Sequence, residues 1–175
     1  MRKAKRGFTL VELLVVISII AMLMGILFPV ITKVRILSRK VVCKANLHAC
    51  AVGFRMYLDE YEDVMPYAAL LPSAKLNDLP RIVDVLEGYI GTAGSLKCPG
   101  DPKGKYFLSE GSSYEYHSML GGQKVANTFL AEKFGVSQIH VLRDYESFHG
   151  KKGRAGSVMY LYADAHIGDR TGASQ

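Results

Sequence analysis

The chain has 175 residues with an ordinary share of apolar side chains, so it predicts one modest globular unit with a further segment attached and excludes a large multidomain enzyme. Its formal net charge is +6, yet four of its 22 basic residues lie in the first seven positions. The remaining 18 basic side chains nearly balance 16 acidic ones. The positive charge is therefore a feature of the N-terminus that indicates membrane topology, and we expect no nucleic-acid partner.

A long apolar segment follows this basic start. Residues 13–31 contain no charged side chain, and as a helix they would be about 28 Å long, which is enough to cross a bilayer. A secretory signal peptide has a shorter apolar core that ends in a cleavage site of small residues, a pattern that "LFPVITKVRILSRK" does not show. We expect the basic start to stay cytoplasmic and the rest to cross, although four basic residues beyond the segment oppose this orientation: Lys33, Arg35, Arg39 and Lys40.

Glu12 places a carboxylate in a run that is otherwise apolar from Phe8 to Ile20, apart from small hydroxyl side chains. An ionisable side chain inside a membrane costs a few kcal/mol unless it is paired, so such a residue points to function. No Lys, Arg or His follows Glu12 before Lys33. Cleavage between Gly7 and Phe8 would create an α-amino group four residues before Glu12, one helical turn away. We predict that this amine pairs with Glu12, within one helix or between neighbouring helices.

The residues at the start of the apolar run form a specific motif: Gly7, Phe8, Thr9, Leu10 and Glu12. Together with the run, they resemble the cleavage and methylation motif of type IV prepilins and type II secretion pseudopilins. The resemblance implies cleavage after Gly7 by a prepilin peptidase, N-methylation of Phe8, and assembly through Phe8 and Glu12. It also implies a filament of pilin-like subunits, homo- or hetero-oligomeric, built on an inner-membrane assembly platform. Pro29 matches a proline common in these proteins.

The helical pattern continues beyond the apolar segment. Apolar side chains recur at helical spacing and would form one stripe along the helix: Ile36, Cys43, Leu47, Cys50, Phe54, Tyr57 and Tyr61. We expect the helix to end near Asp63, because Pro66 disfavours helical geometry at Met65. We also expect Pro29 and Gly25 to kink or locally unwind it.

The remainder of the chain predicts a small α+β head. Residues 82–90 have helical spacing and predict a short helix, whereas "SQIHVLRDYES" and "GSVMYLYADAHIGD" predict strands. The expected fold class is α+β and pilin-like, with a long N-terminal helix, transmembrane in its hydrophobic half, packed on a small antiparallel sheet. The expected organisation is a cleaved leader at 1–7, a membrane and assembly half at 8–31, an amphipathic half at 32–63 and a globular head at 66–175.

Several stretches of the chain also resemble pseudopilin-like proteins of the H-X9-DG type. They are "CKANLHACAVGFRMYLDEYEDVMPYA", "LKCPGDP", "SSYEYHSMLGG" and "FHGKKGRAGSVMYLYADAHIG". The last stretch departs from the pattern in that name, because fourteen residues separate His149 from Asp164 and Ala165 stands where the glycine belongs.

Three cysteines leave the disulfide question open. Cys43 and Cys50 are seven residues apart on one predicted helix, about 10 Å, which is beyond the reach of a disulfide. An internal bridge must therefore join Cys98 to Cys43 or to Cys50, with neither favoured, in an oxidising periplasmic setting. Free buried cysteines are the equal alternative. The indication of a metal site is weak, because Cys and His do not occur at the close spacing of zinc motifs.

The sequence indicates no catalytic group, and we expect a protein that is not an enzyme and needs no cofactor. Its histidines are scattered, and no serine or cysteine occurs in a recognised nucleophile motif. Some pseudopilins bind calcium in C-terminal loops, so the resemblance allows a calcium site of Asp144, Asp164 and Asp169. The alternative is that these aspartates cap turns.

The sequence thus predicts a structural subunit of a pilus-like filament, in the inner membrane with its head outside the cytoplasm. The resemblance favours a type II secretion pseudopilin of the G-like kind. One alternative is a type IV pilin for adhesion or DNA uptake. Another, of a different class, is a signal-anchored periplasmic binding domain or enzyme.

Overall fold

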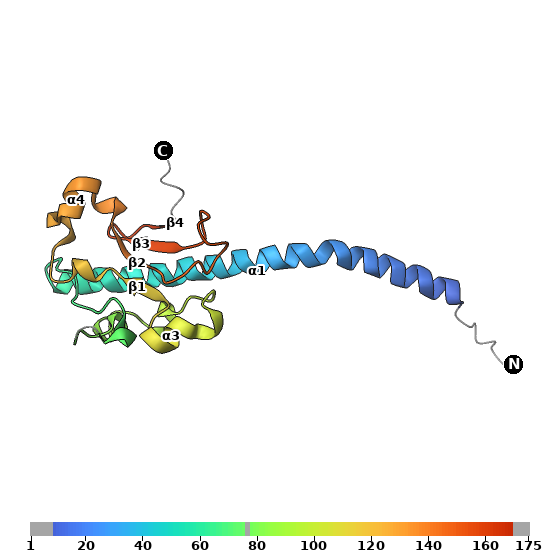
Figure 1. Cartoon of the computed structure of the whole chain (residues 1–175), viewed down its shortest axis with the longest axis horizontal. Helices are drawn as coiled ribbons and strands as arrows, with labels where there is room; N and C mark the ends of the chain where they lie inside the picture. Colours follow the sequence, from blue (N-terminus) through green and yellow to red (C-terminus); the bar gives the residue numbers. More distant parts are fainter. Residues whose placement is uncertain (1–8, 76–77, 170–175) are drawn as a thin grey trace. The chain divides into compact units, whose positions relative to one another are not determined.

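The computed structural model describes residues 9–75 and 78–169, and it divides the chain into two compact units, Met1–Ile36 and Leu37–Gln175. One helix, α1 (Leu10–Glu60), contributes to both units (Figure 1). Pro29 lies inside α1, and the helix continues through it.

The part of α1 in the first unit buries no side chain and carries no charge from residue 13 to residue 31. Every residue from 9 to 39 is exposed, and an 18-residue window has a mean hydropathy of 2.9 with none of it buried. An apolar helix without a polar face is typical of one that is covered by lipid or by other helices.

The part of α1 in the second unit packs on the head with the predicted stripe. Five of the seven stripe residues are buried, whereas Ile36 and Tyr61 at its two ends are exposed. The helix ends at Glu60, earlier than Asp63, because Glu62 and Asp63 adopt left-handed φ angles of 53° and 64°. The Asp63 amide then donates to the carbonyl of Leu58 and closes the helix end.

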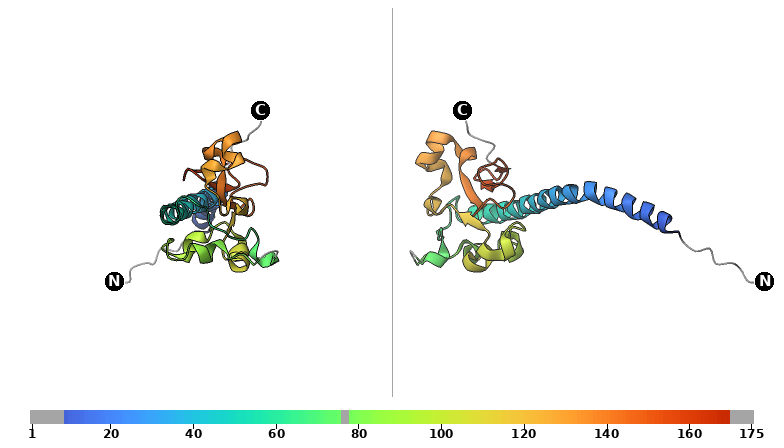
Figure 2. Two further views of the ribbon diagram at one scale, coloured as in Figure 1. Left: turned by 90° about the vertical axis from the view of Figure 1, so that its left-hand side faces the viewer. Right: turned by 45° about the vertical axis from the view of Figure 1, so that its right-hand side comes forward.

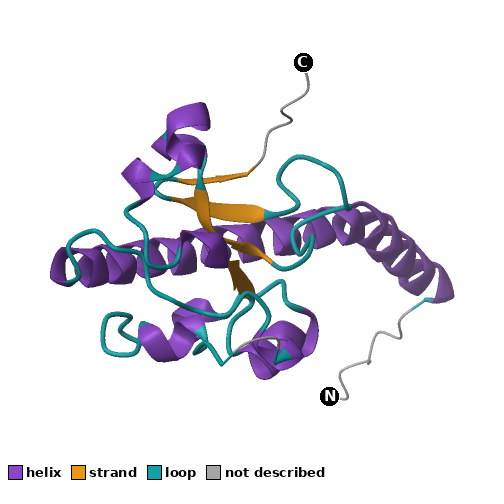
Figure 3. Cartoon of the chain, turned by 60° about the vertical axis from the view of Figure 1, so that its left-hand side comes forward, coloured by secondary structure: helices purple, strands orange, loops and turns teal. Residues whose placement is uncertain are grey.

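Four short strands form one antiparallel sheet in the order β1-β2-β3-β4 (Figure 3). They are β1 (Tyr114–Tyr116), β2 (His140–Asp144), β3 (Met159–Tyr162) and β4 (Ile167–Asp169). Glu115 pairs with Arg143, Arg143 with Tyr160, and Tyr160 with Gly168. The two stretches predicted as strands contain β2, β3 and β4. These elements confirm the α+β class with a long N-terminal helix on an antiparallel sheet.

The core of the head lies where α1 meets the sheet. Leu47, Cys50 and Phe54 of α1 belong to the same buried cluster as residues of β1, β2 and β3, and the ring of Phe54 stacks on Tyr116 with centroids 6.1 Å apart. Two further helices, α3 (Lys105–Glu110) and α4 (Phe129–Phe134), lie on opposite sides of this centre (Figure 2).

The helix predicted at residues 82–90 is shorter than expected. The structure has α2 (Ile82–Val85), and the chain then turns through Gly88, whose φ is +94°. After this turn, Tyr89 and Ile90 lie very close to α1. A Cβ on Gly53 would lie 2.6 Å from Cγ1 of Ile90 and 3.2 Å from the carbonyl oxygen of Tyr89. Glycine at position 53 therefore sets how closely this loop packs.

Candidate functional site

The N-terminus of α1 is closed by a reciprocal pair of hydrogen bonds between Thr9 and Glu12. The amide of Thr9 donates to Oε2 of Glu12 at 2.9 Å, and the Thr9 hydroxyl donates to the same oxygen at 2.7 Å. In return, the amide of Glu12 donates to Oγ1 of Thr9 at 3.2 Å. This is a capping box, which satisfies amide groups that the first helical turn leaves without partners.

The capping box gives Glu12 a structural role that the sequence analysis missed. Its signal is present in the sequence, because Thr9-Leu10-Val11-Glu12 has the spacing of a capping box immediately before an apolar run. Gly7 and Phe8, the predicted cleavage and methylation positions, lie outside the described residues. The predicted pairing of the Phe8 amine with Glu12 thus stays a prediction.

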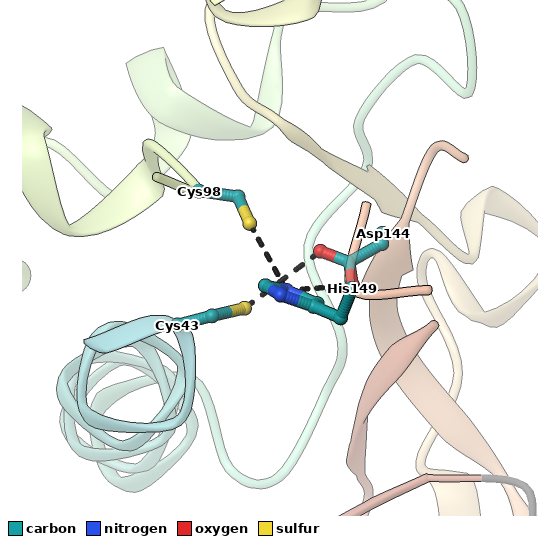
Figure 4. A group of neighbouring side chains, drawn as sticks. All are labelled: Cys43, Cys98, Asp144 and His149. Atoms are coloured by element: carbon teal, nitrogen blue, oxygen red, sulfur yellow. Dashed lines mark hydrogen bonds and ion pairs between the residues drawn. The ribbon is translucent and has the colours of Figure 1, made fainter. Parts of the chain in front are cut away.

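A second group of functional side chains lies inside the head, where four elements meet (Figure 4). Cys43 comes from α1 and Cys98 from the loop before α3, while Asp144 ends β2 and His149 lies in the loop that leads to β3. We call these residues the four-residue cluster. All four are buried, and their potential ligand atoms all lie within 4.8 Å of one another.

Direct contacts connect the members of the four-residue cluster. Sγ of Cys98 lies 3.2 Å from Nε2 of His149, and the same nitrogen lies 3.5 Å from Oδ2 of Asp144. The thiol of Cys43 donates to Oδ1 of Asp144 at 3.8 Å. Figure 4 shows the four side chains pointing toward one common point. Nδ1 of His149 is the single buried side-chain nitrogen or oxygen without a hydrogen-bond partner in the part of the chain that the structure describes.

The backbone around the four-residue cluster holds the side chains in these positions. The amide of Met159 donates to Oδ2 of Asp144 at 2.7 Å, and the amide of Gly100 donates to Sγ of Cys98 at 3.4 Å. A Cβ on Gly100 would lie 2.7 Å from Cβ of Phe148 and 3.3 Å from Cε1 of His149. The "CPGD" sequence therefore lets the Cys98 loop approach the His149 loop as closely as it does.

Burial and mutual contact shift the proton affinities in the four-residue cluster. Burial raises the pKa of Asp144 to about 9, because a carboxylate loses its hydration there. A hydrogen bond from Cys43 lowers the pKa of the Cys98 thiol, and the same interaction together with burial raises the pKa of Cys43. Of these two thiols, Cys98 is therefore the more acidic.

Of the residues predicted for a disulfide, Cys50 lies outside the four-residue cluster. The three cysteines are all free and buried, and Cys50 donates from its thiol to the carbonyl of Ser95 at 3.5 Å. Cys43, and not Cys50, is thus the cysteine of α1 that lies beside Cys98 in the four-residue cluster. The pairing of Cys98 in a disulfide stays a prediction.

The three aspartates predicted for calcium lie in different surroundings, and calcium binding by them stays a prediction. Asp164 contacts His166 at 2.5 Å, and Asp169 binds the ammonium group of Lys40 at 2.8 Å. Among residues 9–75 and 78–169, the potential metal ligands that gather in threes or more are those of the four-residue cluster, and Asp144 is its one aspartate. The turns after β2 and β3 carry these carboxylates to different surroundings.

Comparison with known proteins gives one result for the N-terminal segment and none for the whole chain. Residues 2–28 match the family described as the prokaryotic N-terminal methylation motif, a range that contains Gly7, Phe8 and Glu12. No curated protein and no solved structure matches the chain. The family match thus concerns the start of the chain and does not extend to the head.

Proposed function

We propose that the chain is a pilin-like protein and a structural subunit of a pilus-like filament, because residues 2–28 match the prokaryotic N-terminal methylation motif. The motif supports processing by a prepilin peptidase and a structural role rather than an enzymatic one. In this chain we place the cleavage between Gly7 and Phe8, with methylation on the new amino group of Phe8. The motif and the apolar helix together indicate membrane anchoring.

The observation that carries the proposal is the exposure of the apolar part of α1. Burial of one Leu or Ile side chain is worth about 1.5–3 kcal/mol, so a helix that exposes residues 10–36 needs a cover. Lipid supplies that cover before assembly, and the same surface of neighbouring subunits supplies it in a filament, where close helix packing replaces lipid contacts.

Glu12 connects processing to assembly in this proposal. In the uncut chain its carboxylate accepts two hydrogen bonds from Thr9, which compensates part of the cost of its position. Cleavage after Gly7 then adds an ammonium group one helical turn away. That charge can pair with Glu12 of the same or a neighbouring subunit and so set the axial position of one subunit against the next.

Within this class we propose a type II secretion pseudopilin of the G-like kind, in the inner membrane with a cytoplasmic leader and the head on the far side. A type IV pilin for adhesion or DNA uptake is the alternative. Deletion of the gene distinguishes them: loss of protein secretion without loss of surface filaments supports the pseudopilin, whereas loss of surface filaments with intact secretion supports the pilin.

Mass spectrometry of the N-terminus tests the processing step. We expect the mature chain to begin at N-methylated Phe8 in cells with an active prepilin peptidase and at Met1 in cells without it. A chain that keeps its first seven residues in both strains would contradict the proposal. Gly7→Ala offers a second test, because it should block cleavage without altering the head.

Three substitutions at the start of α1 separate the charge of Glu12 from its role in the capping box. Glu12→Gln keeps a carbonyl acceptor for Thr9 but removes the charge, so it should be processed normally and fail to assemble, as Glu12→Ala should. Thr9→Ala removes the capping box and keeps the charge, so it should assemble. Sedimented filament yield is the measurement, and normal filaments from Glu12→Gln would show that the charge is not needed.

A further inference from the structure

We propose that the four-residue cluster binds one zinc ion and that this ion ties α1 to the sheet of the head. The cluster offers two cysteine sulfurs, one imidazole nitrogen and one carboxylate oxygen, which are the three ligand types that zinc uses in proteins. This inference concerns residues 43–149 and does not depend on the filament function proposed above.

The spacing of the ligand atoms fits a tetrahedral site. Zinc with bonds of about 2.0–2.3 Å places neighbouring ligand atoms about 3.3–3.8 Å apart. Nε2 of His149 lies 3.2 Å from Sγ of Cys98 and 3.5 Å from Oδ2 of Asp144, and Sγ of Cys43 lies 3.8 Å from Oδ1, the other oxygen of the same carboxyl group. Because no pair of ligand atoms is more than 4.8 Å apart, an ion at their centre requires only small side-chain movements.

The surroundings of Asp144 also leave room for a cation partner. Asp144 is fully buried, and among the described residues its ion-pair partner is His149, with no Lys or Arg beside it. Zinc binding would displace the protons that the thiols and the Asp144 carboxyl group hold, and leave two thiolates and one carboxylate around a doubly charged ion. The ion would then offset two of these three buried negative charges.

The surroundings favour a structural site over a catalytic one. All four ligands are buried, so no open position remains for water or substrate. The amides of Gly100 and Met159 point at Cys98 and Asp144, as outer-shell donors do at metal sites. Calcium does not suit the cluster, because calcium takes six to eight oxygen ligands.

A disulfide between Cys43 and Cys98 is the competing use of the same sulfur atoms. It would engage two of the four residues and leave Asp144 buried beside His149 without a cation. Zinc accounts for all four side chains at once, since each supplies one ligand atom to the same centre. Zinc in the head would also explain why two distant segments, "VVCKANL" and "LKCPGD", each place a cysteine at this point.

Metal analysis of the full chain tests the proposal. The protein is extracted in detergent without chelators, purified through a tag that lacks histidine, and examined by elemental mass spectrometry. We expect one zinc per chain in the unaltered protein, and loss of that zinc in Cys98→Ala and in His149→Ala. Cys50→Ala is the matched control, because it removes a buried cysteine of the same helix from outside the cluster and should keep one zinc.

Cobalt spectroscopy keeps the test valid even if a variant misfolds. After chelation under reducing conditions, the unaltered chain should take up one Co²⁺ and show the visible bands of tetrahedral cobalt with a thiolate charge-transfer absorption. Absence of both zinc and cobalt binding would overturn the proposal, and so would a Cys43–Cys98 disulfide found by non-reducing peptide mapping. Zinc retained by both Cys98→Ala and His149→Ala would also overturn it, because the ion would then lie elsewhere.

Discussion

The two halves of α1 form one continuous helix, but they meet opposite environments. Residues 9–39 are all exposed, whereas buried positions begin at Cys43 and recur at helical spacing to Tyr57. The first half is the more apolar, so apolarity alone does not determine which part of the helix packs on the head. The part that packs is the one with a single apolar stripe and a polar opposite face, because such a helix can bury one face against the sheet and leave the other in water.

Removal of one leucine from each half should give the largest contrast. Leu47 is fully buried in the core and Leu23 is 61% exposed. Leu47→Ala should lower the free energy of unfolding of the head by about 2–5 kcal/mol, whereas Leu23→Ala should change it by less than about 0.5 kcal/mol. The chain has 10 Tyr and no Trp, so near-ultraviolet circular dichroism of the tyrosines in denaturant is a suitable measurement on the full chain in detergent. Equal losses in the two variants would contradict the comparison.

The two glycines of α1 should sharpen the same contrast. A Cβ on Gly53 would collide with Ile90, while a Cβ on Gly25 would meet nothing within 4 Å. We expect Gly53→Ala to destabilise the head by about 1–3 kcal/mol through overpacking. Gly25→Ala should leave the head unchanged and favour the helix by up to about 1 kcal/mol. The same denaturation assay measures the first effect, and helix content by far-ultraviolet circular dichroism measures the second.

The ion pair between Lys40 and Asp169 lies near the point where the two environments meet, and its effect should be the smallest. The hydrogen bond from Lys40 lowers the pKa of Asp169. A carboxyl group whose pKa is lowered by folding adds stability above its unfolded pKa of about 3.9, and this stability is lost as the pH falls through the folded value. Asp169→Asn should therefore cost at most about 1 kcal/mol at pH 7 and progressively less as the pH falls below about 3.9. A difference between the two proteins that persists unchanged in acid would contradict this assignment.

The sequence predicted the elements whose signal is local. The stripe from Cys43 to Tyr57 and the strands β2, β3 and β4 follow from periodicity, which is a property of neighbouring residues. The strand β1 did not follow, because three residues are too few to show alternation, and its tyrosines are buried by contacts with distant segments. The end of α1 at Glu60 was also missed, because two non-glycine residues adopt left-handed geometry after it.

The two candidate sites also differ in whether their sequence signal is local. The motif at Gly7, Phe8 and Glu12 is contiguous, so its processing role could be predicted from residue types alone. The cluster of Cys43, Cys98, Asp144 and His149 could not, because consecutive members are up to 55 residues apart along the chain and match no zinc spacing.

The sequence by itself determined the processing motif, the membrane-length apolar segment and the amphipathic stripe that continues it, since each is a pattern along one stretch of chain. Only the tertiary structure shows that Asp144 lies apart from Asp164 and Asp169 and beside two cysteines and a histidine. The physical reason is that convergence of ligands depends on how α1, the Cys98 loop and β2 pack together. That packing is set by the buried core and by close approaches such as the one at Gly100.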